Sequence, residues 1–322
     1  MSALMEIIRC PRTGDSKCSV FKDKVVFDKA NKSYIYHENV VDFVDYNKSD
    51  FGYERAVENW GENLHKECNS IPETWHHDKM RQHFGEDLYV GNTILEIGCG
   101  PGYDLYNAAN KSPAKEFIGL DLGENLFSLG FRDRNVKNIR YVRCDALNLP
   151  FQDECIDSIV SFGVFHHTPS PQKCMKEAHR VLKRGGKLSI YLYKNHEDNF
   201  LKWIGVIGEN IIMRITKNIP HNMGKKICYF LAPFMLLFFS WPAQLLKIFP
   251  ITRKLGNKFP MHWGNDISSI IGDLEDRLLA PVNHRYSKQD FEKLFTEAGF
   301  QELKIVTTTE GHYGLGKKKT DQ

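Results

Sequence analysis

The sequence predicts an α/β fold in which a parallel sheet carries helices on both faces, with a small N-terminal unit and an inserted helical segment. Three observations lead to this prediction. Five short apolar runs alternate with helical or turn sequence across residues 93–193, a rhythm typical of parallel strands joined by crossover helices. A glycine-rich loop follows the first run, and acidic residues recur at the ends of the first three runs. The segment 195–282 departs from the rhythm.

Composition and charge are those of an ordinary globular protein. Of the 322 residues, 42% are hydrophobic and 26% are charged, and the net charge is +3, so no strong overall field attracts nucleic acid. The opening stretch "MSALMEIIRCPRTG" lacks the long apolar core of a secretion signal. Eight cysteines are scattered without regular pairing, as expected of free thiols in a reducing compartment. We therefore expect a cytoplasmic protein.

Residues 1–46 are predicted to form a small unit of short strands. The stretches "KVVF" and "SYIYHENVVDFV" alternate apolar and polar residues, with turn sequence between them. Residues 51–90 look helical and carry Trp60, Leu64 and Trp75 among charges. The two tryptophans could cover a ligand bound at the sheet, although large aromatic residues more often belong to a core.

The five apolar runs are the predicted strands of the sheet: "TILEIG" (93–98), "EFIGLD" (116–121), "IRYVRCD" (139–145), "CIDSIVSFG" (155–163) and "KLSIYLY" (187–193). Ser287 begins a capped amphipathic helix that ends at Gly299, and "QELKIVTTT" follows as a final strand. The predicted sheet domain therefore comprises residues 47–194 and 283–322.

The glycine-rich loop "EIGCGPGY" places Gly98, Gly100 and Gly102 between the first strand and a helix. Glycine lets the backbone turn sharply and lets a ligand approach it closely, and the helix N-terminus adds free N–H groups. The dinucleotide-binding pattern fails because Tyr103 stands where its third glycine belongs, and no phosphate-loop lysine follows. The alternative is a tight strand–helix turn that binds nothing.

Two acids sharpen this interpretation. Asp121 ends the second strand, where a carboxylate can accept both hydroxyls of a ribose. Asp145 ends the third strand, where it can accept a hydrogen bond from an adenine amino group. Each acid could instead cap a helix, but their recurrence at successive strand ends favours a nucleoside site.

Together these motifs resemble the class I methyltransferases that depend on S-adenosylmethionine and have a Rossmann-like sheet. The likeness is close over about residues 90–193 and weaker over 283–309. It implies S-adenosylmethionine as cofactor, S-adenosylhomocysteine as product, and no metal. The cofactor-binding residues implied by the resemblance are Glu96, Gly98, Cys99, Gly100, Gly102, Asp121, Leu122, Asp145, Ala146, Phe162 and Gly163.

The resemblance also assigns roles to these positions. The glycine loop and Glu96 surround the amino-acid end of the cofactor. The ribose and adenine meet the pairs Asp121–Leu122 and Asp145–Ala146, and the methyl group lies beside Phe162 and Gly163. The sequence departs from the family at its end. Only "EGHYGLGKKKTDQ" follows the last predicted strand, so the usual closing hairpin is expected to be short or frayed.

Candidate catalytic residues lie beyond the fourth and fifth strands. His166 and His167 follow the fourth strand, and either could be a base because histidine titrates near neutral pH. The alternative is that they cap or pack the next helix. Tyr193 ends the fifth strand, facing the acceptor side, and "NHRY" offers His284, Arg285 and Tyr286 before the last helix. In similar sequences this stretch covers the pocket, and the alternative is a surface loop.

The N-terminal unit resembles a small zinc-ribbon-like module, known as Trm112-like, that precedes some bacterial methyltransferases. Cys10 and Cys18 match only the first half of its metal site, and no second pair appears before Cys68. Four-ligand zinc binding is therefore not expected, and we predict a metal-free packing or interaction unit.

The inserted segment 195–282 contains a basic, apolar block. Residues 210–265 hold eight Lys and Arg and no Asp or Glu, and "ICYFLAPFMLLFFSWPAQLL" (227–246) carries no charge. A single membrane span is disfavoured because the chain must return to the same sheet, and because Pro233 and Pro242 are expected to break a continuous helix. Two interpretations stay open: a helical lid over the acceptor, and a segment lying at a membrane surface.

The sequence thus predicts methyl transfer from S-adenosylmethionine to a small, partly apolar or lipid-like acceptor. A small polar metabolite or sugar is the alternative acceptor, and a non-catalytic cofactor-binding or membrane-adaptor protein is the alternative function. Nucleic acid is not an expected partner, because the basic block is apolar rather than interleaved with aromatic residues along a groove. A membrane surface through 210–265, at the inner face of the membrane, is a candidate partner. The sequence leaves the oligomeric state open.

Overall fold

A computed structural model describes residues 3–29, 32–37, 39–44, 75–261 and 266–320 of the chain. Its centre is one sheet of 11 strands in the order β1-β2-β3-β4-β7-β6-β5-β8-β9-β11-β10. The strands from β4 to β9 in this order run parallel, and β11 is antiparallel to both of its neighbours. The central order confirms the predicted α/β fold with a parallel sheet.

The strand bounds are β1 (Cys18–Phe21), β2 (Lys24–Phe27), β3 (Lys32–His37), β4 (Val40–Asp42), β5 (Thr93–Ile97), β6 (Glu116–Asp121), β7 (Ile139–Arg143), β8 (Ile156–Phe162), β9 (Leu182–Tyr193), β10 (Phe300–Thr307) and β11 (Gly311–Lys318). All five apolar runs predicted as strands are confirmed as β5 to β9. Their β-branched and aromatic residues are buried on both faces, as parallel strands require.

The helices are α1 (Ala3–Ile7), α3 (Trp75–Phe84), α4 (Tyr103–Lys111), α5 (Asn125–Arg132), α6 (Pro171–Val181), α7 (Phe200–Thr216), α8 (His221–Met235), α9 (Trp241–Ile248), α10 (Arg253–Gly256), α11 (Ile267–Leu278) and α12 (Lys288–Glu297). Short turns of other helix types are η1 (Gly85–Leu88), η2 (Phe165–His167) and the π-helical η3 (Leu236–Ser240). Trp75 begins α3, whereas Trp60 and Leu64 lie outside the described residues.

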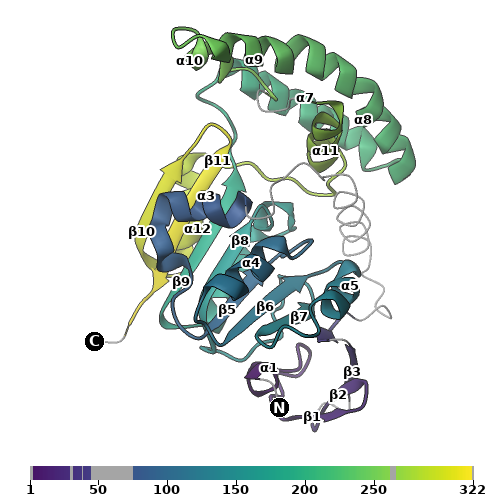
Figure 1. The fold of residues 1–322 in the computed structure, drawn as a ribbon, viewed down its shortest axis with the longest axis vertical. Coiled ribbons are helices and arrows are strands. Elements are labelled where there is room, and N and C mark those ends of the chain that lie inside the picture. Colours follow the sequence, from purple (N-terminus) through teal and green to yellow (C-terminus); the bar gives the residue numbers. More distant parts are fainter. Residues whose placement is uncertain (1–2, 30–31, 38, 45–74, 262–265, 321–322) are drawn as a thin grey trace.

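Two apolar layers separate the helices from the sheet. Side chains of α4 and α5 pack with Phe117 and Tyr141, while those of α6 and α12 pack with Ile159 and Ile190. Ser287 caps α12 by accepting a hydrogen bond from the Asp290 N–H, as predicted. The helices cover both faces of the sheet and leave the carboxyl ends of the parallel strands for the loops (Figure 1).

The closing hairpin of the sheet is complete, so the expectation of a short or frayed last strand is wrong. β11 pairs with β9 from Gly311 to Lys317 and with β10 along its other edge. Tyr313 and Leu315 are buried. Gly314 and Gly316 let the rings of α12 lie against the strand, where a Cβ would approach Phe295 within 2.6 Å. The glycine-rich sequence hid the strand because close packing, rather than strand propensity, selects those residues.

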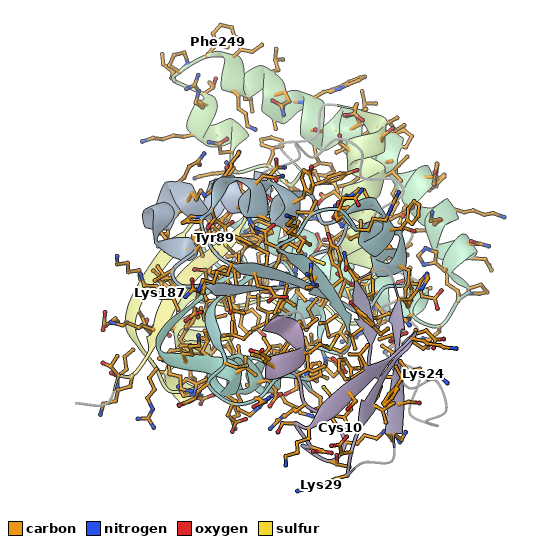
Figure 2. The ribbon with its side chains drawn as sticks, turned by 60° about the horizontal axis from the view of Figure 1, so that its bottom comes forward. Cys10, Lys24, Lys29, Tyr89, Lys187 and Phe249 are labelled. Carbon is orange, nitrogen blue, oxygen red and sulfur yellow. The ribbon has the colours of Figure 1, made fainter. Side chains whose placement is uncertain are left out.

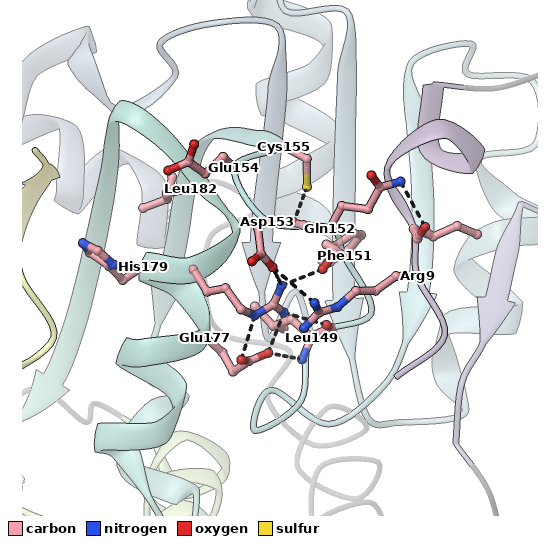
Figure 3. Close-up of polar contacts among 12 residues, drawn as sticks. Arg9, Leu149, Phe151, Gln152, Asp153, Glu154, Cys155, Glu177, His179 and Leu182 are labelled. Atoms are coloured by element: carbon pink, nitrogen blue, oxygen red, sulfur yellow. Dashed lines mark hydrogen bonds and ion pairs between the residues drawn. The ribbon is translucent and has the colours of Figure 1, made fainter. Parts of the chain in front are cut away.

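The N-terminal strands continue the main sheet. β4 pairs in parallel with β7, and the buried Arg143 guanidinium contacts the Asp42 carboxylate at 2.9 Å. A second contact lies around Asp153, which binds Arg9 at 3.2 Å and Arg180 at 2.7 Å. Figure 3 shows this cluster, in which Gln152 also donates to the Glu6 carbonyl at 2.7 Å. The unit is therefore held by main-chain pairing and by ion pairs.

The inserted segment folds into helices at the end of the molecule opposite the N-terminal unit (Figure 1). α8, η3 and α9 run on as one helix, His221–Ile248, so the expected break at Pro233 and Pro242 is wrong. Pro233 lies inside α8, the π-helical turn follows it, and Pro242 falls in the first turn of α9. A π-helical turn can absorb the backbone bond that proline cannot donate.

Candidate active site

The glycine loop takes the conformation that its sequence predicts. Gly98, Gly100 and Gly102 have φ of 75°, 48° and 70°, a region that costs other residues energy. A Cβ on Gly98 would lie 2.1 Å from Val164 Cγ2, so the loop passes directly over the turn after β8. Cys99 is buried within the loop, and burial raises the pKa of its thiol well above the usual range. The Cys99 thiol is therefore inert.

Asp121, at the end of β6, binds the same loop. Its Oδ2 accepts the Gly100 N–H at 2.9 Å, and its Oδ1 accepts the N–H groups of Leu122 and Gly123 at 2.7 and 3.1 Å. A carboxylate has about four acceptor positions, so Oδ2 still has capacity for a hydroxyl donor. The Leu122 carbonyl accepts from buried Arg143 at 3.0 Å, which fixes this turn to the N-terminal unit through Asp42.

Asp145 and Ala146 follow β7 at the same edge of the sheet. Asp145 Oδ1 accepts the Leu147 N–H at 2.9 Å, which leaves Oδ2 for another donor. Burial raises the pKa of the Asp145 carboxyl, and Ala146 is buried beside it. The structure thus brings Asp121, Asp145 and the glycine loop together at successive strand ends.

Helix α3 covers this edge through two histidines that the sequence analysis did not single out. His77 Nε2 lies 3.3 Å from Glu96 Oε1, and both side chains are buried. Burial would lower the pKa of His77, but the Glu96 carboxylate raises it; burial also raises the pKa of Glu96. The pair therefore retains a proton more readily than either group in water. Asp104, in the first turn of α4, binds His76 and the His77 N–H at 3.2 and 3.1 Å.

Three aromatic rings are stacked at the ends of β8 and β9. His76 lies on Phe162 with ring centres 4.1 Å apart, and Phe162 lies on Tyr191 at 4.4 Å. Next to them, a Cβ added to Gly163 would meet only His166 Cε1, at 4.0 Å. Gly163 therefore borders open space beside the ring stack.

His166 and His167 are buried behind Gly163. Burial and the neighbouring imidazole hold the pKa of His166 well below its ordinary value, and burial lowers the pKa of His167 as well. His167 Nδ1 contacts the Val282 carbonyl at 2.8 Å. Among the described residues, neither ring nitrogen of His166 has a hydrogen-bond partner. His166 is thus a neutral imidazole that can offer a nitrogen to a bound molecule.

The inserted helices close this end through Asp276 of α11. Asp276 Oδ2 accepts the Tyr193 hydroxyl at 2.5 Å, and Oδ1 lies 3.7 Å from His167 Nε2. The ring centres of Tyr193 and His166 are 4.1 Å apart. Burial, with Asp276 beside it, raises the pKa of Tyr193 well above its usual range, so Tyr193 is a hydrogen-bond donor rather than a base.

A largely buried ion network extends from this contact. Arg277 binds Asp273 at 2.9 Å and Glu209 at 3.1 Å. Glu209, on α7, also binds Arg285, whose guanidinium lies over the Tyr193 ring with its central carbon 5.5 Å from the ring centre. The network joins two inserted helices to the stretch that returns to the sheet.

The remaining candidates lie on this returning stretch. His284 Nε2 contacts the Thr168 carbonyl at 3.1 Å, and its N–H donates to the His166 carbonyl at 2.8 Å. The Tyr286 side chain is buried in the main core, while its N–H donates to the Tyr193 carbonyl at 3.0 Å. The stretch therefore packs against the candidate site, and Tyr286 supports it from the core.

Sequence analysis also missed Lys202, on the buried side of α7. Burial lowers the pKa of this amine to about 8, and its Nζ donates to the Thr309 carbonyl at 3.4 Å. His196, six residues before Lys202, is also buried, and burial lowers its pKa to about 3. Both residues lie in the inserted segment, outside the strand and loop motifs, where no local pattern predicts such burial.

Cys10 and Cys18, the half-site of the N-terminal unit, make separate contacts. The Cys10 thiol lies 3.4 Å from the Tyr34 hydroxyl, and the Cys18 thiol donates to the Met5 carbonyl at 3.6 Å. Cys68 lies outside the described residues. Among those described, no three His, Cys, Asp or Glu side chains gather as metal ligands.

Comparison with known proteins gives a consistent picture for the centre of the chain. The sequence model of a family described as a methyltransferase domain matches residues 95–190. The probable tRNA methyltransferase 9B of Homo sapiens is 36% identical over 124 residues, which cover 38% of this chain and 25% of that protein. The demethylmenaquinone methyltransferase of Staphylococcus haemolyticus (strain JCSC1435) is 34% identical over 126 residues, 37% of this chain and 52% of that protein. The chain therefore spans about half, or less, of these relatives.

Among solved structures, a putative S-adenosyl-L-methionine-dependent methyltransferase from Methanococcus maripaludis covers 87% of this chain and 98% of its own, with 19% identity and a TM-score of 0.44. A SAM-dependent methyltransferase from Aquifex aeolicus covers 80% and 97%, with 16% identity and a TM-score of 0.45. Because these scores are low, the fold assignment rests on the strand order described above.

Proposed function

Residues 95–190 are a methyltransferase domain of the class I, S-adenosylmethionine-dependent type, and from this premise we propose that the chain transfers a methyl group to a small, partly apolar acceptor. One observation carries the proposal. A nucleoside-type edge, with Asp121 and Asp145 at successive strand ends, continues into a buried ring cluster around His166 and Tyr193. Gly163 lies where these two regions meet.

The residues at the first region fit S-adenosylmethionine. Asp121 has acceptor capacity for a ribose hydroxyl, and Asp145 has a free oxygen for an adenine amino group. Glu96 Oε2 is buried without a hydrogen-bond partner among the described residues, and it suits the ammonium group of the amino-acid end. Open space beside Gly163 would accommodate the sulfonium region, and the aromatic stack bordering it suits a cationic group.

When bound, S-adenosylmethionine supplies a methyl group that is already activated for transfer. The chain then has to align the acceptor with it and exclude water, and alignment alone can provide roughly 7–11 kcal/mol of the barrier. Phe162, Tyr191 and Tyr193 provide an aromatic wall. His166, neutral and buried, has two ring nitrogens without a partner among the described residues, so it can hydrogen-bond to an acceptor hydroxyl or amine and orient it.

The aromatic wall also bears on the acceptor class. Flat rings favour a molecule with apolar or aromatic character, and the inserted helices restrict the acceptor end through Asp276 and Arg277. The curated relatives are named for tRNA and for demethylmenaquinone. We favour the second kind of molecule, a small apolar ring compound, because the buried rings form a compact wall rather than an extended basic groove.

Two measurements test the proposal. Calorimetry should show S-adenosylmethionine binding to the purified chain, and incubation with methyl-labelled cofactor and a lipid-soluble cell extract should give a labelled small molecule for mass spectrometry. Binding without any labelled product from lipid-soluble, polar and RNA fractions would support the non-catalytic alternative. Labelled RNA as the main product would refute the acceptor class.

A further inference from the structure

The inserted helices carry an exposed apolar surface that the proposed reaction does not require. Of the 27 large hydrophobic side chains that are exposed in the described part of the chain, 20 lie between Phe200 and Ile267. Soluble proteins scatter such residues singly, whereas a continuous apolar patch marks an interaction surface. The concentration of these exposed apolar side chains on one segment therefore indicates an interaction surface.

The long helix formed by α8, η3 and α9 is apolar on two opposite faces. Its inner face, with Cys228, Ala232 and Leu236, packs on α11. Its outer face exposes residues spaced three or four apart, which we call the outer stripe: Phe230, Phe234, Leu237, Trp241, Leu245 and Ile248. This spacing places them on one side of a helix. The helix is also long and apolar enough to cross a membrane, by length and composition.

The outer stripe ends in an apolar tip, the turn 249–251. Phe249 is 60% exposed and Ile251 is 95% exposed, and the basic residues Arg253 and Lys254 follow directly in α10. Figure 2 shows Phe249 at one extreme of the molecule, with Lys24 and Lys29 near the other. A projecting apolar turn beside cations suits insertion beneath lipid headgroups.

The charge around this surface is of one sign. Residues 210–265 hold no Asp or Glu, and the exposed basic residues there are Arg214, Lys217, Lys226, Arg253, Lys254 and Lys258. Anionic headgroups attract such residues. A second copy of the chain would instead place these cations against one another, because a two-fold interface pairs each patch with itself.

We propose that the outer stripe and the tip dock on an anionic lipid bilayer, with the long helix lying in the plane of the membrane surface. Crossing the bilayer would strip the inner face from α11, where Cys228 and Leu236 pack and Lys225 lies 3.8 Å from the buried Glu275 carboxylate. Docking in the plane of the membrane keeps these contacts and buries only the outer stripe and the tip. The same helical layer carries Asp276 to Tyr193, so docking brings the acceptor end of the site toward the membrane surface.

Flotation with vesicles tests the surface without reference to catalysis. The full chain should float with phosphatidylcholine vesicles that contain phosphatidylserine, and flotation should weaken with added salt as headgroup attraction is screened. Phe249→Ser with Ile251→Ser, and separately Arg253→Glu with Lys254→Glu, should each reduce the partition coefficient on the order of tenfold or more. Alkaline carbonate should release the protein, because the helix does not span the bilayer.

Matched variants at the other end of the molecule serve as controls. Phe21 is 63% exposed, so Phe21→Ser removes a comparable side chain, and Lys24→Glu with Lys29→Glu reverses two exposed charges. Both controls should float like the wild-type chain. No flotation at low salt, equal losses in the controls, retention after carbonate, or a dimer in light scattering that Phe249→Ser dissociates would each overturn the proposal.

Discussion

The two ends of the candidate site are held together by contacts of very different range along the chain. At the nucleoside end, Asp121 binds the N–H groups of Leu122, Gly123 and Gly100, which are 1, 2 and 21 residues away. At the acceptor end, Tyr193 binds Asp276 across 83 residues, and the hydrogen bond from the His284 N–H to the His166 carbonyl spans 118. The first end is built mainly from the loops that follow consecutive strands of the central sheet, whereas the second exists only once the inserted helices have docked.

The largest expected effect is at the acceptor end. Replacing Arg277 by Met should lower the free energy of unfolding by about 3–5 kcal/mol, because it removes the cation of the largely buried Asp273 carboxylate and leaves Glu209 with Arg285 alone. Denaturant unfolding measures the change. Lys293→Met removes an exposed pair with Glu297 and should cost under about 0.5 kcal/mol. If the two variants lost equal stability, Arg277 would not join the inserted helices to the fold.

The next prediction concerns the nucleoside end, where alanine substitutions at two glycines separate the cost of steric crowding from the cost of backbone strain. Gly98 and Gly85 both have φ of +75°, but a Cβ on Gly98 meets Val164 at 2.1 Å, while one on Gly85 meets nothing within 4 Å. Gly85→Ala should therefore cost only the conformational strain of about 1–2 kcal/mol, and Gly98→Ala should cost about 1–3 kcal/mol more. Thermal unfolding compares them. Equal costs would mean that the loop can move away from Val164.

The difference in range explains what the sequence could predict. The five central strands, the α12 cap and the nucleoside-end residues follow from local patterns, and the structure brings Asp121, Asp145 and the glycine loop together as expected. His77 opposite Glu96 and Asp276 opposite Tyr193 could not be predicted, because no pattern in one segment reports which distant helix will cover it. β11 was missed for a related reason, since its glycines reflect the approach of Phe295. The Trm112-like interpretation and the absence of zinc stay predictions, which elemental analysis of the purified protein can test.

The nucleoside end should govern affinity for the cofactor on its own. Asp121→Asn should weaken S-adenosylmethionine binding by about 2–3 kcal/mol, because charge-assisted hydrogen bonds to the ribose are lost. Asp157→Asn is a matched control. Its carboxylate also accepts two backbone N–H groups, those of Asn92 and Thr93, but at the start of β5, the opposite edge of the sheet. Calorimetry on both folded variants should separate them, and unchanged affinity in Asp121→Asn would remove the ribose assignment.

The smallest effect concerns pH, and its sign should differ between the two ends. Burial lowers the pKa of His166 below its unfolded value of about 6.5. As pH falls through about 6.5, His166 binds a proton in the unfolded chain but not in the folded chain. The free energy of unfolding therefore decreases by up to about 1.4 kcal/mol per pH unit. The pKa of His77 is instead raised by Glu96. Its contribution is therefore fully present below about pH 6.5 and is lost as pH rises through the folded pKa.

Two substitutions should therefore move the acid side of the stability curve in opposite directions. His166→Met removes a group that resists protonation, so denaturant unfolding between about pH 5 and 8 should show a flatter loss toward acid than in the wild-type chain. His77→Gln removes a group that binds a proton more tightly in the folded state, beside Glu96, so the loss of stability toward acid should be steeper than in the wild-type chain. Measured at the same pH values, the two variants report on the two ends separately. If the stability curves of both variants ran parallel to the wild-type curve, neither imidazole would differ in protonation between the folded and unfolded states. The proposed electrostatic difference between the nucleoside end and the acceptor end would then be wrong.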